Sequence, residues 1–237
     1  TARVLSTEWI NGSRLQDLPK KQRRRALRQS VEACLVQLLI TGFVHADPHE
    51  GNLLYTPDGR VAFLDFGLVD RVKPDVMQGF AEGMKAIVAK EWLQVALRMQ
   101  DIGWTTVPVK RNLRPGKPYP VFEDCEFEEF VDALGKEFEG DLEAQMKLGK
   151  TVAAIRRLAD RYLMLTPPYV VLITRTFVTL EGLVDRIDPT FNIYTMALPV
   201  TLRRMLSPAT QHAKKALRQQ VLTEEGEVQW ENIEGML

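Results

Sequence analysis

The chain has 237 residues, of which 45% are hydrophobic and 26% charged, and its 31 basic residues balance its 31 acidic residues. This composition is typical of a globular domain, and the zero net charge excludes bulk attraction to nucleic acid or anionic lipid. Two cysteines are too few for a disulfide framework or a zinc site. Cys34 lies on an apolar helical face, so we expect a buried free thiol, although the sequence leaves open a bridge to Cys125.

Apolar residues recur at three- and four-residue intervals between about Lys20 and Thr41, and they predict one long amphipathic helix. Gly42 is suited to end this helix, because glycine readily adopts the left-handed conformation that follows many helices. Five of the six residues at 20–25 are cations. We interpret them as a solvated helix face, with a nuclear-localisation signal or a patch for lipid headgroups as the alternatives.

The most informative pattern is His-Ala-Asp-Pro-His-Glu-Gly-Asn at residues 45–52, followed by Asp-Phe-Gly at 65–67. Asp47 precedes Asn52 by five residues, and Asp65 follows thirteen residues later, which are separations used by kinase-type phosphoryl-transfer sites. Mg²⁺ prefers hard oxygen ligands. Asn52 and Asp65 are therefore the expected metal ligands, and Asp47 is the expected catalytic residue that orients a nucleophile or accepts its proton.

The residues between Asn52 and Asp65 predict a β-hairpin. Two short apolar runs, 53–55 and 61–64, flank Thr-Pro-Asp-Gly-Arg at 56–60. Proline presets φ and glycine accepts a positive φ, so these residues predict a tight turn between the two strands. The hairpin is expected to fold Asn52 and Asp65 back to the same end, around one divalent cation.

Two histidines lie beside Asp47. We expect His45 to support the backbone near the metal-binding Asp65, as the equivalent histidine does in kinase-like loops. A zinc site made by His45 and His49 is the weaker alternative. Their spacing of four residues suits zinc only on a helix, and Pro48 disfavours a helix there.

A helical pattern begins at about residue 74, soon after Asp-Phe-Gly. Protein kinases place a long activation segment and an Ala-Pro-Glu anchor at this point, and together these build the peptide-docking surface. Neither is present in the sequence, so we expect no conventional protein substrate.

The second half of the chain is predicted to be mostly helical. Residues 103–120 hold four of the thirteen prolines and are expected to form a loop. Helices are expected at 122–138 and 141–164. Residues 209–237 are polar and of mixed charge, and we expect a loosely docked helix or tail.

The most apolar segment is the helix expected at 169–186. Its longest uninterrupted apolar run is well short of the ~20 residues that span a bilayer, so we expect a core helix. Arg175 and Glu181 interrupt this run, and they either form a buried pair or face solvent.

The motif form His-Ala-Asp-Pro-His-x-Gly-Asn resembles the UbiB/ADCK (aarF-domain, ABC-one) atypical kinase family, as do Pro-Pro-Tyr at 167–169 and Leu-Glu-Gly at 180–182 through Asp-Pro at 188–189. Ordinary protein kinases read His-Arg-Asp-Leu-Lys instead. The resemblance implies an α+β, mostly helical fold: a protein-kinase-like C-lobe with a small catalytic β-hairpin and a C-terminal helical extension. Glu50 stands where the family usually carries proline, and we expect little consequence.

The same resemblance interprets residues 1–12 as the last N-lobe strand and the hinge. Thr7 would be the gatekeeper, and the backbone groups of Glu8 and Ile10 would bind the adenine of ATP or ADP. An apolar strand that ends in Asn-Gly is, however, common in any α/β protein. No Gly-x-Gly-x-x-Gly phosphate loop occurs in the chain. We therefore expect a fragment that lacks its N-lobe and is inactive alone, although the parent protein is expected to be an enzyme.

The remaining domains follow from this comparison. Residues 13–102 would form the kinase-like C-lobe core, 103–120 a loop, and 121–207 the family-type helical remainder, before a polar tail at 208–237. No signal peptide or transit segment is visible, and a chain clipped at its N-terminus would show none.

The function that the resemblance implies is that of an ATP- or ADP-binding atypical kinase or ATPase with Mg²⁺. His49 would contact phosphate in place of the lysine of ordinary kinases. Such a protein would support isoprenoid-quinone or prenyl-lipid metabolism at membranes of plastids, mitochondria or bacteria, with no nucleic-acid partner. The alternatives are a small-molecule phosphotransferase of the aminoglycoside/choline kinase type and a non-catalytic pseudokinase binding module.

Overall fold

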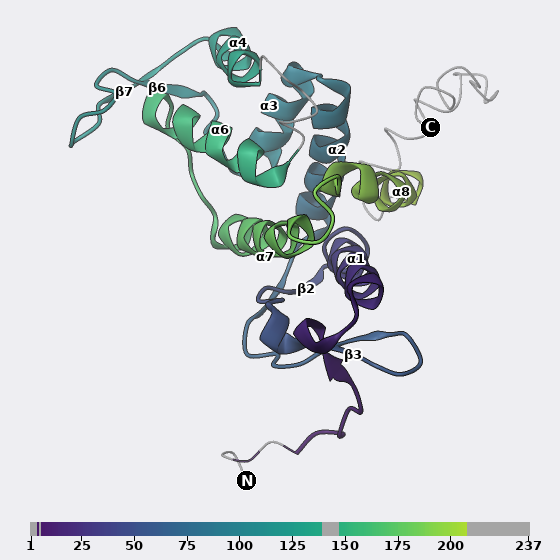
Figure 1. Cartoon of the computed structure of the whole chain (residues 1–237). Helices are drawn as coiled ribbons and strands as arrows, with labels where there is room; N and C mark the ends of the chain where they lie inside the picture. Colours follow the sequence, from purple (N-terminus) through teal and green to yellow (C-terminus); the bar gives the residue numbers. More distant parts are fainter. Residues whose placement is uncertain (1–3, 5, 139–146, 208–237) are drawn as a thin grey trace, which may run out of the picture.

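The computed structural model of the chain describes residues 4, 6–138 and 147–207 (Figure 1). It is a mostly helical α+β fold with small antiparallel strand pairs, as predicted. The helices are α1 (Lys20–Val36), α2 (Pro74–Ala89), α3 (Trp92–Asp101), α4 (Phe127–Glu137), α6 (Leu148–Arg161), α7 (Pro168–Asp185) and α8 (Ile193–Leu206). The strands are β1 (Ser13–Arg14), β2 (Phe43–His45), β3 (Leu53–Tyr55), β4 (Val61–Phe63), β5 (Val69–Arg71), β6 (Lys110–Asn112) and β7 (Phe122–Asp124).

α1 continues into a π-helical turn, Gln37–Thr41, that ends at Gly42 with a φ of 69°. A side chain at Gly42 would place its Cβ 2.7 Å from the Val72 carbonyl oxygen, so only glycine fits there. The helix end predicted at Gly42 is confirmed. The π turn was not evident from the apolar periodicity. It positions the Gln37 side-chain oxygen to accept the His45 backbone N–H at 3.0 Å.

Two strand pairs hold the Asp-Phe-Gly segment at 65–67. The predicted hairpin is confirmed: β3 and β4 pair antiparallel, with Leu53 opposite Phe63, and β1 extends the sheet beside β3. After the segment, β5 pairs with β2 and places Val69 opposite His45. The catalytic-type loop and the Asp-Phe-Gly turn are therefore anchored to each other at both ends.

The helices enclose two hydrophobic cores. The first includes Leu39, Phe177 and Tyr194, each at most 1% exposed, and is built mainly by α1, α2, α7 and α8. The second includes Phe130 and Leu158 and is built mainly by α3, α4 and α6. α2 contributes side chains to both cores, so it joins the layer that carries the site to the second helical layer.

The N-terminal strand expected within residues 1–12 does not form in the described residues 6–12, and the first strand is β1. A strand requires neighbouring chains to satisfy its N–H and C=O groups. The described part of the chain supplies no neighbour at 6–12, which is the physical reason for the difference.

The segment expected to be a loop at 103–120 contains β6, which pairs with β7 and places Lys110 opposite Asp124. Because residues 122–124 form β7, the helix expected at 122–138 begins only at Phe127, as α4. Strands of three residues next to prolines carry too little periodicity to be predicted. Of the helix expected at 141–164, the described residues form α6, which ends at Arg161 because Tyr162 and Met164 bridge to Arg111 and Thr105. The expected tail at 208–237 lies outside the described residues.

α7 is the core helix predicted at 169–186, and no helix in the described residues is long and apolar enough to cross a membrane. Arg175 and Glu181 do not pair with each other. Glu181 is buried and accepts the N–H groups of Leu148 and Gly149 at 2.8 and 2.9 Å, which satisfies the first turn of α6. Arg175 lies on the exposed face of α7.

The cation run at 20–25 is only partly a solvated face. Arg23 forms an ion pair with Glu50, and Arg24 forms one with the buried Asp188 at 2.8 Å. These contacts connect the start of α1 to the loop at 45–52 and to the end of α7. The other cations of the run, Lys20, Lys21 and Arg25, are exposed as predicted.

The two cysteines are free, and Cys34 is buried as predicted. Burial raises the pKa of the Cys34 thiol to about 12. The pKa of the Cys125 thiol is also raised, first by partial burial and second by the nearby Glu129 carboxylate. The reactive thiolate of Cys34 is therefore absent near pH 8. We expect a thiol-specific chromogenic reagent to label Cys125 in the native chain and Cys34 only in denaturant. Fast native labelling of a Cys125→Ser variant would contradict the burial of Cys34.

Candidate functional site

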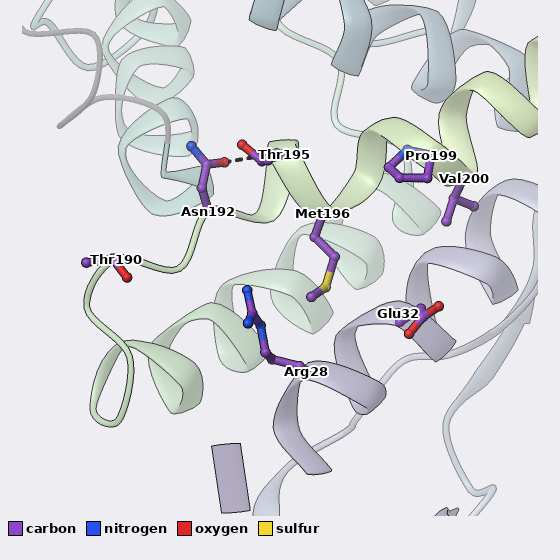
Figure 2. A pocket seen from close by; sticks show the side chains of 8 residues that line it. All are labelled: Arg28, Glu32, Thr190, Asn192, Thr195, Met196, Pro199 and Val200. Atoms are coloured by element: carbon purple, nitrogen blue, oxygen red, sulfur yellow. Dashed lines mark hydrogen bonds between the residues drawn. The ribbon is translucent and has the colours of Figure 1, made fainter. Parts of the chain in front are cut away.

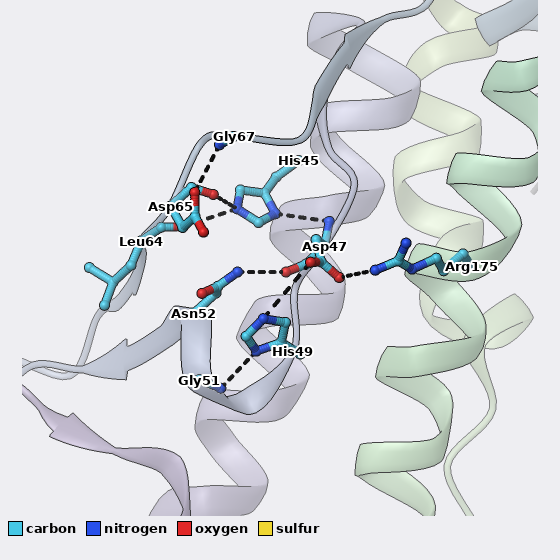
Figure 3. Close-up of polar contacts among 9 residues, drawn as sticks. All are labelled: His45, Asp47, His49, Gly51, Asn52, Leu64, Asp65, Gly67 and Arg175. Atoms are coloured by element: carbon cyan, nitrogen blue, oxygen red, sulfur yellow. Dashed lines mark hydrogen bonds and ion pairs between the residues drawn. The ribbon is translucent and has the colours of Figure 1, made fainter. Parts of the chain in front are cut away.

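His45 forms the centre of the candidate site (Figure 3). Its side chain is buried, and its Nε2 lies 3.1 Å from the Leu64 carbonyl oxygen and 3.0 Å from the Asp65 carbonyl oxygen. Its Nδ1 accepts the Asp47 backbone N–H at 3.3 Å, so the proton belongs on Nε2, which donates to the two carbonyls. The imidazole thus joins the loop at 45–52 to the Asp-Phe-Gly turn. Because both nitrogens are engaged by backbone, His45 has none left for zinc.

Asn52 is the second connection between the two segments. It is 8% exposed, and its Nδ2 donates to the Asp47 backbone carbonyl at 3.1 Å. The Asn52 backbone carbonyl accepts the Leu64 N–H at 2.8 Å. The Asn52 Oδ1 has no hydrogen-bond partner within the described residues, so this oxygen is available to a ligand.

Asp65 occupies a left-handed backbone conformation, with a φ of 48°. Aspartate tolerates this region better than most residues because its short side chain bonds locally. Here the Asp65 Oδ1 accepts the Gly67 N–H at 3.0 Å. A Cβ at Gly67 would lie 2.9 Å from that same oxygen, so a side chain there would displace the Asp65 carboxylate. The second Asp65 carboxylate oxygen has no partner among the residues described.

The Asp47 carboxylate points to a different element. Its Oδ1 accepts from Arg175 Nη2 on α7 at 2.6 Å, and His49 Nε2 lies 3.8 Å from its Oδ2. His49 is also fixed by its Nδ1, which accepts the Gly51 N–H at 3.1 Å. Asp47 is therefore partly neutralised by an arginine that lies far from it in the sequence.

Together these contacts bring Asp47, Asn52 and Asp65 into one hydrogen-bonded unit across the hairpin. In Figure 3 the Asn52 and Asp65 side chains lie beyond Asp47, away from Arg175. A free amide oxygen and a free carboxylate oxygen are the hard donors that Mg²⁺ accepts, with phosphate and water completing its octahedron. No group of three or more His, Cys, Asp or Glu residues suited to a metal occurs in the described part of the chain. The donor set thus fits a cation shared with a phosphate ligand better than an all-protein cage.

The predicted hinge residues are not part of this unit. Glu8 is exposed and Ile10 half-buried on the extended segment before β1, which leads away from the helices in Figure 1. A cavity of about 420 Å³ lies elsewhere, between α1, α8 and the connection before α8 (Figure 2). It is lined by Arg28, Glu32, Thr190, Asn192, Thr195, Met196, Pro199 and Val200, none of which comes from the loop at 45–52.

Three contributors to the site were missed by sequence reasoning. Arg175 was noted only as a charge that interrupts an apolar helix, which was the available signal. Glu50 was expected to matter little, yet its ion pair with Arg23 attaches the loop to α1. Gln37 carried no signal, because its contact with His45 depends on the π turn.

The Arg175–Asp47 pair is not expected to contribute much to stability. The Arg175 side chain is 55% exposed, and exposed ion pairs contribute at most about 1 kcal/mol. We expect Arg175→Met to lower the free energy of unfolding by less than about 1 kcal/mol, measured by urea denaturation at low and high salt. Arg186→Met, at the end of α7, is the matched control. A loss of several kcal/mol specific to Arg175 would show that the pair is structural.

Comparisons with known proteins identify the family of two parts of the chain. Residues 1–99 match the ABC1 atypical kinase-like domain, and residues 131–192 match the UbiB helical domain. A protein of Synechocystis sp. is 32% identical over 240 residues, covering 99% of this chain and 40% of its own length. From Arabidopsis thaliana, a chloroplastic aarF domain-containing protein kinase is 29% identical, covering 100% of this chain and 32% of its own. The chloroplastic Activity of BC1 Complex Kinase 3 of the same organism is 28% identical, and the match covers 99% of this chain and 32% of that protein.

The fold is kinase-like, mostly helical and of the α+β class, and the two domain matches together cover more than half of the chain. The chain belongs to the UbiB/ADCK (ABC1, aarF-domain) atypical kinase-like family. It spans 32–40% of the length of the curated relatives described above.

Proposed function

We propose that this chain supplies the metal- and phosphate-binding half of an atypical kinase or ATPase site that takes ATP or ADP with Mg²⁺. The observation that carries the proposal is the hydrogen-bonded unit around His45, which holds Asp47, Asn52 and Asp65 together across the β3–β4 hairpin. Kinase-type phosphoryl transfer depends on positioning and charge stabilisation by an Asp, Asn and Asp set of this kind.

Each residue has a proposed role. Asn52 Oδ1 and the free oxygen of Asp65 would hold Mg²⁺, which when bound neutralises charge on the phosphates. His49 would lie against a phosphate oxygen through its Nε2–H. Asp47 would orient the acceptor group and accept its proton once its carboxylate is released from Arg175.

The adenine would be bound by the backbone of Glu8 and Ile10. In this proposal residues 1–12 are the end of an N-lobe and the hinge, 13–102 the C-lobe core, 103–120 its connection and 121–207 the helical remainder. An N-lobe packed against the hinge would give the strand expected at 1–12 a neighbour, which the described residues do not supply at 6–12.

A non-catalytic binding module is the second candidate, and one observation favours it. Arg175 Nη2 lies 2.6 Å from the Asp47 carboxylate and occupies an oxygen that a base would need. A protein in which this pair persisted would bind nucleotide without transferring phosphate.

The biological setting is proposed from the names of the relatives. Two of the relatives described above are named as chloroplastic kinases, which supports a plastid location and, by the family resemblance, a role in isoprenoid-quinone or prenyl-lipid metabolism. The Synechocystis relative supports a bacterial setting equally well.

Calorimetric titration tests the proposal. We expect a protein that contains this chain and an N-lobe to bind ATP or ADP in the presence of Mg²⁺ and far more weakly in EDTA. The 237-residue chain alone should bind weakly and turn over negligibly, because half of the cleft is missing. Absence of any Mg²⁺-dependent nucleotide binding by the two-lobe protein would refute the proposal. Turnover by the isolated chain equal to that of the two-lobe protein would refute the need for an N-lobe.

A further inference from the structure

The β6–β7 hairpin extends away from the packed helices, at the left of Figure 1. The residues that connect its two strands, 113–121, are exposed without interruption. We call this segment the hairpin tip. Kinase-type chemistry, as proposed above, makes no use of it.

Both the base and the tip of the hairpin form hydrogen bonds with the end of α6 and the residues that follow it. Asn112 is buried, and its Nδ2 donates to the Asp160 carbonyl at the end of α6 at 2.8 Å. The Gly116 N–H donates to the Asp160 carboxylate at 2.9 Å, and the Leu163 N–H donates to the Lys110 carbonyl at 2.8 Å. The tip is therefore presented in a defined position by the helical layer.

Charge is distributed unevenly along the hairpin. The strand cations are paired, Lys110 with Asp124 at 3.1 Å and Arg111 with Glu123. The tip carries Arg114 and Lys117 and no acidic residue, and neither cation forms an ion pair within the described residues. The tip thus presents two cations without an ion pair in the described part of the chain, and the Asp160 carboxylate bonded to the Gly116 N–H is the acidic group in contact with its backbone.

The same tip exposes apolar surface. Tyr119 is 84% exposed, and Leu113 and Val121 are 49% and 45% exposed. Apolar side chains grouped on a rigid projection, with cations beside them, mark an interaction site. Tyrosine is favoured where one end of a side chain is apolar and the other is wet, as at a membrane–water interface.

We infer that the hairpin tip docks on the surface of an anionic lipid bilayer. Tyr119, Leu113 and Val121 would enter the headgroup region, while Arg114 and Lys117 would contact lipid phosphates. The alternative for a tip with three prolines is binding to a protein domain that recognises polyproline II helices. That mode requires φ near −75°, whereas Gly116 and Tyr119 have φ values of 71° and 66°. The tip is a folded turn and not an extended helix of this type.

Vesicle co-sedimentation of the 237-residue chain tests this inference. We expect the chain to bind vesicles of phosphatidylcholine mixed with phosphatidylglycerol, to bind phosphatidylcholine vesicles much less, and to dissociate at high salt. The double variant Arg114→Gln, Lys117→Gln should weaken partitioning onto anionic vesicles by about thirtyfold, since each cation contributes about fivefold. Tyr119→Ser should weaken binding at low and high salt alike, because its contribution is apolar.

The matched control removes the same charge elsewhere. The control is the double variant Lys20→Gln, Lys21→Gln at the exposed start of α1, and it should leave partitioning onto anionic vesicles nearly unchanged. All of these side chains are exposed, so every variant should keep the thermal midpoint of the parent chain, which circular dichroism checks. The inference is overturned if the parent chain does not bind anionic vesicles. It is also overturned if the α1 variant loses binding as strongly as the tip variant, which would place the contact at the cation run of α1.

Discussion

Asp65→Asn is expected to weaken Mg²⁺-dependent binding of ATP by about 100-fold or more in the two-lobe protein. Loss of residues that merely orient a metal ligand costs 10- to 100-fold in metal affinity, so loss of a charged ligand should cost at least that much. The backbone should be unaffected, because asparagine also tolerates the left-handed φ of 48° at this position and can accept the Gly67 N–H. Calorimetric titration with and without Mg²⁺ measures the effect.

Asp70→Asn is the matched control for this prediction. It makes the same chemical change in β5, where the Asp70 carboxylate accepts only the Arg71 N–H among the described residues, at 2.7 Å. Nucleotide affinity should stay close to that of the parent. Equal losses in the two variants would mean that the charge of the region, and not ligation by Asp65, determines binding.

His45→Phe is expected to lower the free energy of unfolding by about 3 kcal/mol. The substitution keeps an aromatic ring beside Phe63 and Phe66, whose centroids lie 5.3 and 5.5 Å from that of the imidazole. It leaves the Asp47 N–H and the Leu64 and Asp65 carbonyls without their partner. An orphaned buried group costs about 1–3 kcal/mol, and some of the three will find water. Urea denaturation followed by circular dichroism gives the value.

His49→Phe provides the comparison for His45→Phe. The His49 side chain is half-exposed and accepts one local N–H, from Gly51, so its loss should cost less than about 1 kcal/mol. Similar losses for both variants would contradict the central structural role given to His45.

Features set by short-range chemistry could be predicted from the sequence. The turn at 56–60 depends on Pro57 and Gly59, which lie two positions apart, and the end of the π turn after α1 depends on one glycine at position 42. The spacing of Asp47, Asn52 and Asp65 was informative because a short hairpin necessarily returns its two ends to one place. These elements need little knowledge of the rest of the fold.

Features set by distant contacts could not be predicted. Arg175 reaches Asp47 across 128 residues, and no local pattern announces that contact. The apolar periodicity does not predict the π turn or the bond from the His45 N–H to the Gln37 side chain that accompanies it. β6 and β7 are three residues each, and β6 depends on its contacts with α6. The strand expected within 1–12 does not form in its described part, 6–12, for the opposite reason: the sequence favours a strand, but no described neighbour pairs with it.

The Arg175–Asp47 pair connects the structure to the two functional candidates. A kinase needs the Asp47 carboxylate free to meet an acceptor, whereas a binding module does not. Because the pair is exposed and contributes at most about 1 kcal/mol, the proposed binding of nucleotide or acceptor would supply enough free energy to displace it. The same reasoning explains why Arg175→Met should change stability so little.

Paramagnetic Mn²⁺ substituted for Mg²⁺ in the nucleotide complex of the two-lobe protein tests the central claim most directly. The ion broadens NMR signals close to it, and Mn²⁺ accepts the same oxygen ligands as Mg²⁺. We predict that broadening will centre on the Asn52 side-chain amide and the backbone amides of 65–67, and that Asp65→Asn will remove it. Broadening centred on any other part of the chain, with the Asn52 amide unaffected, would contradict a metal site built by Asn52 and Asp65.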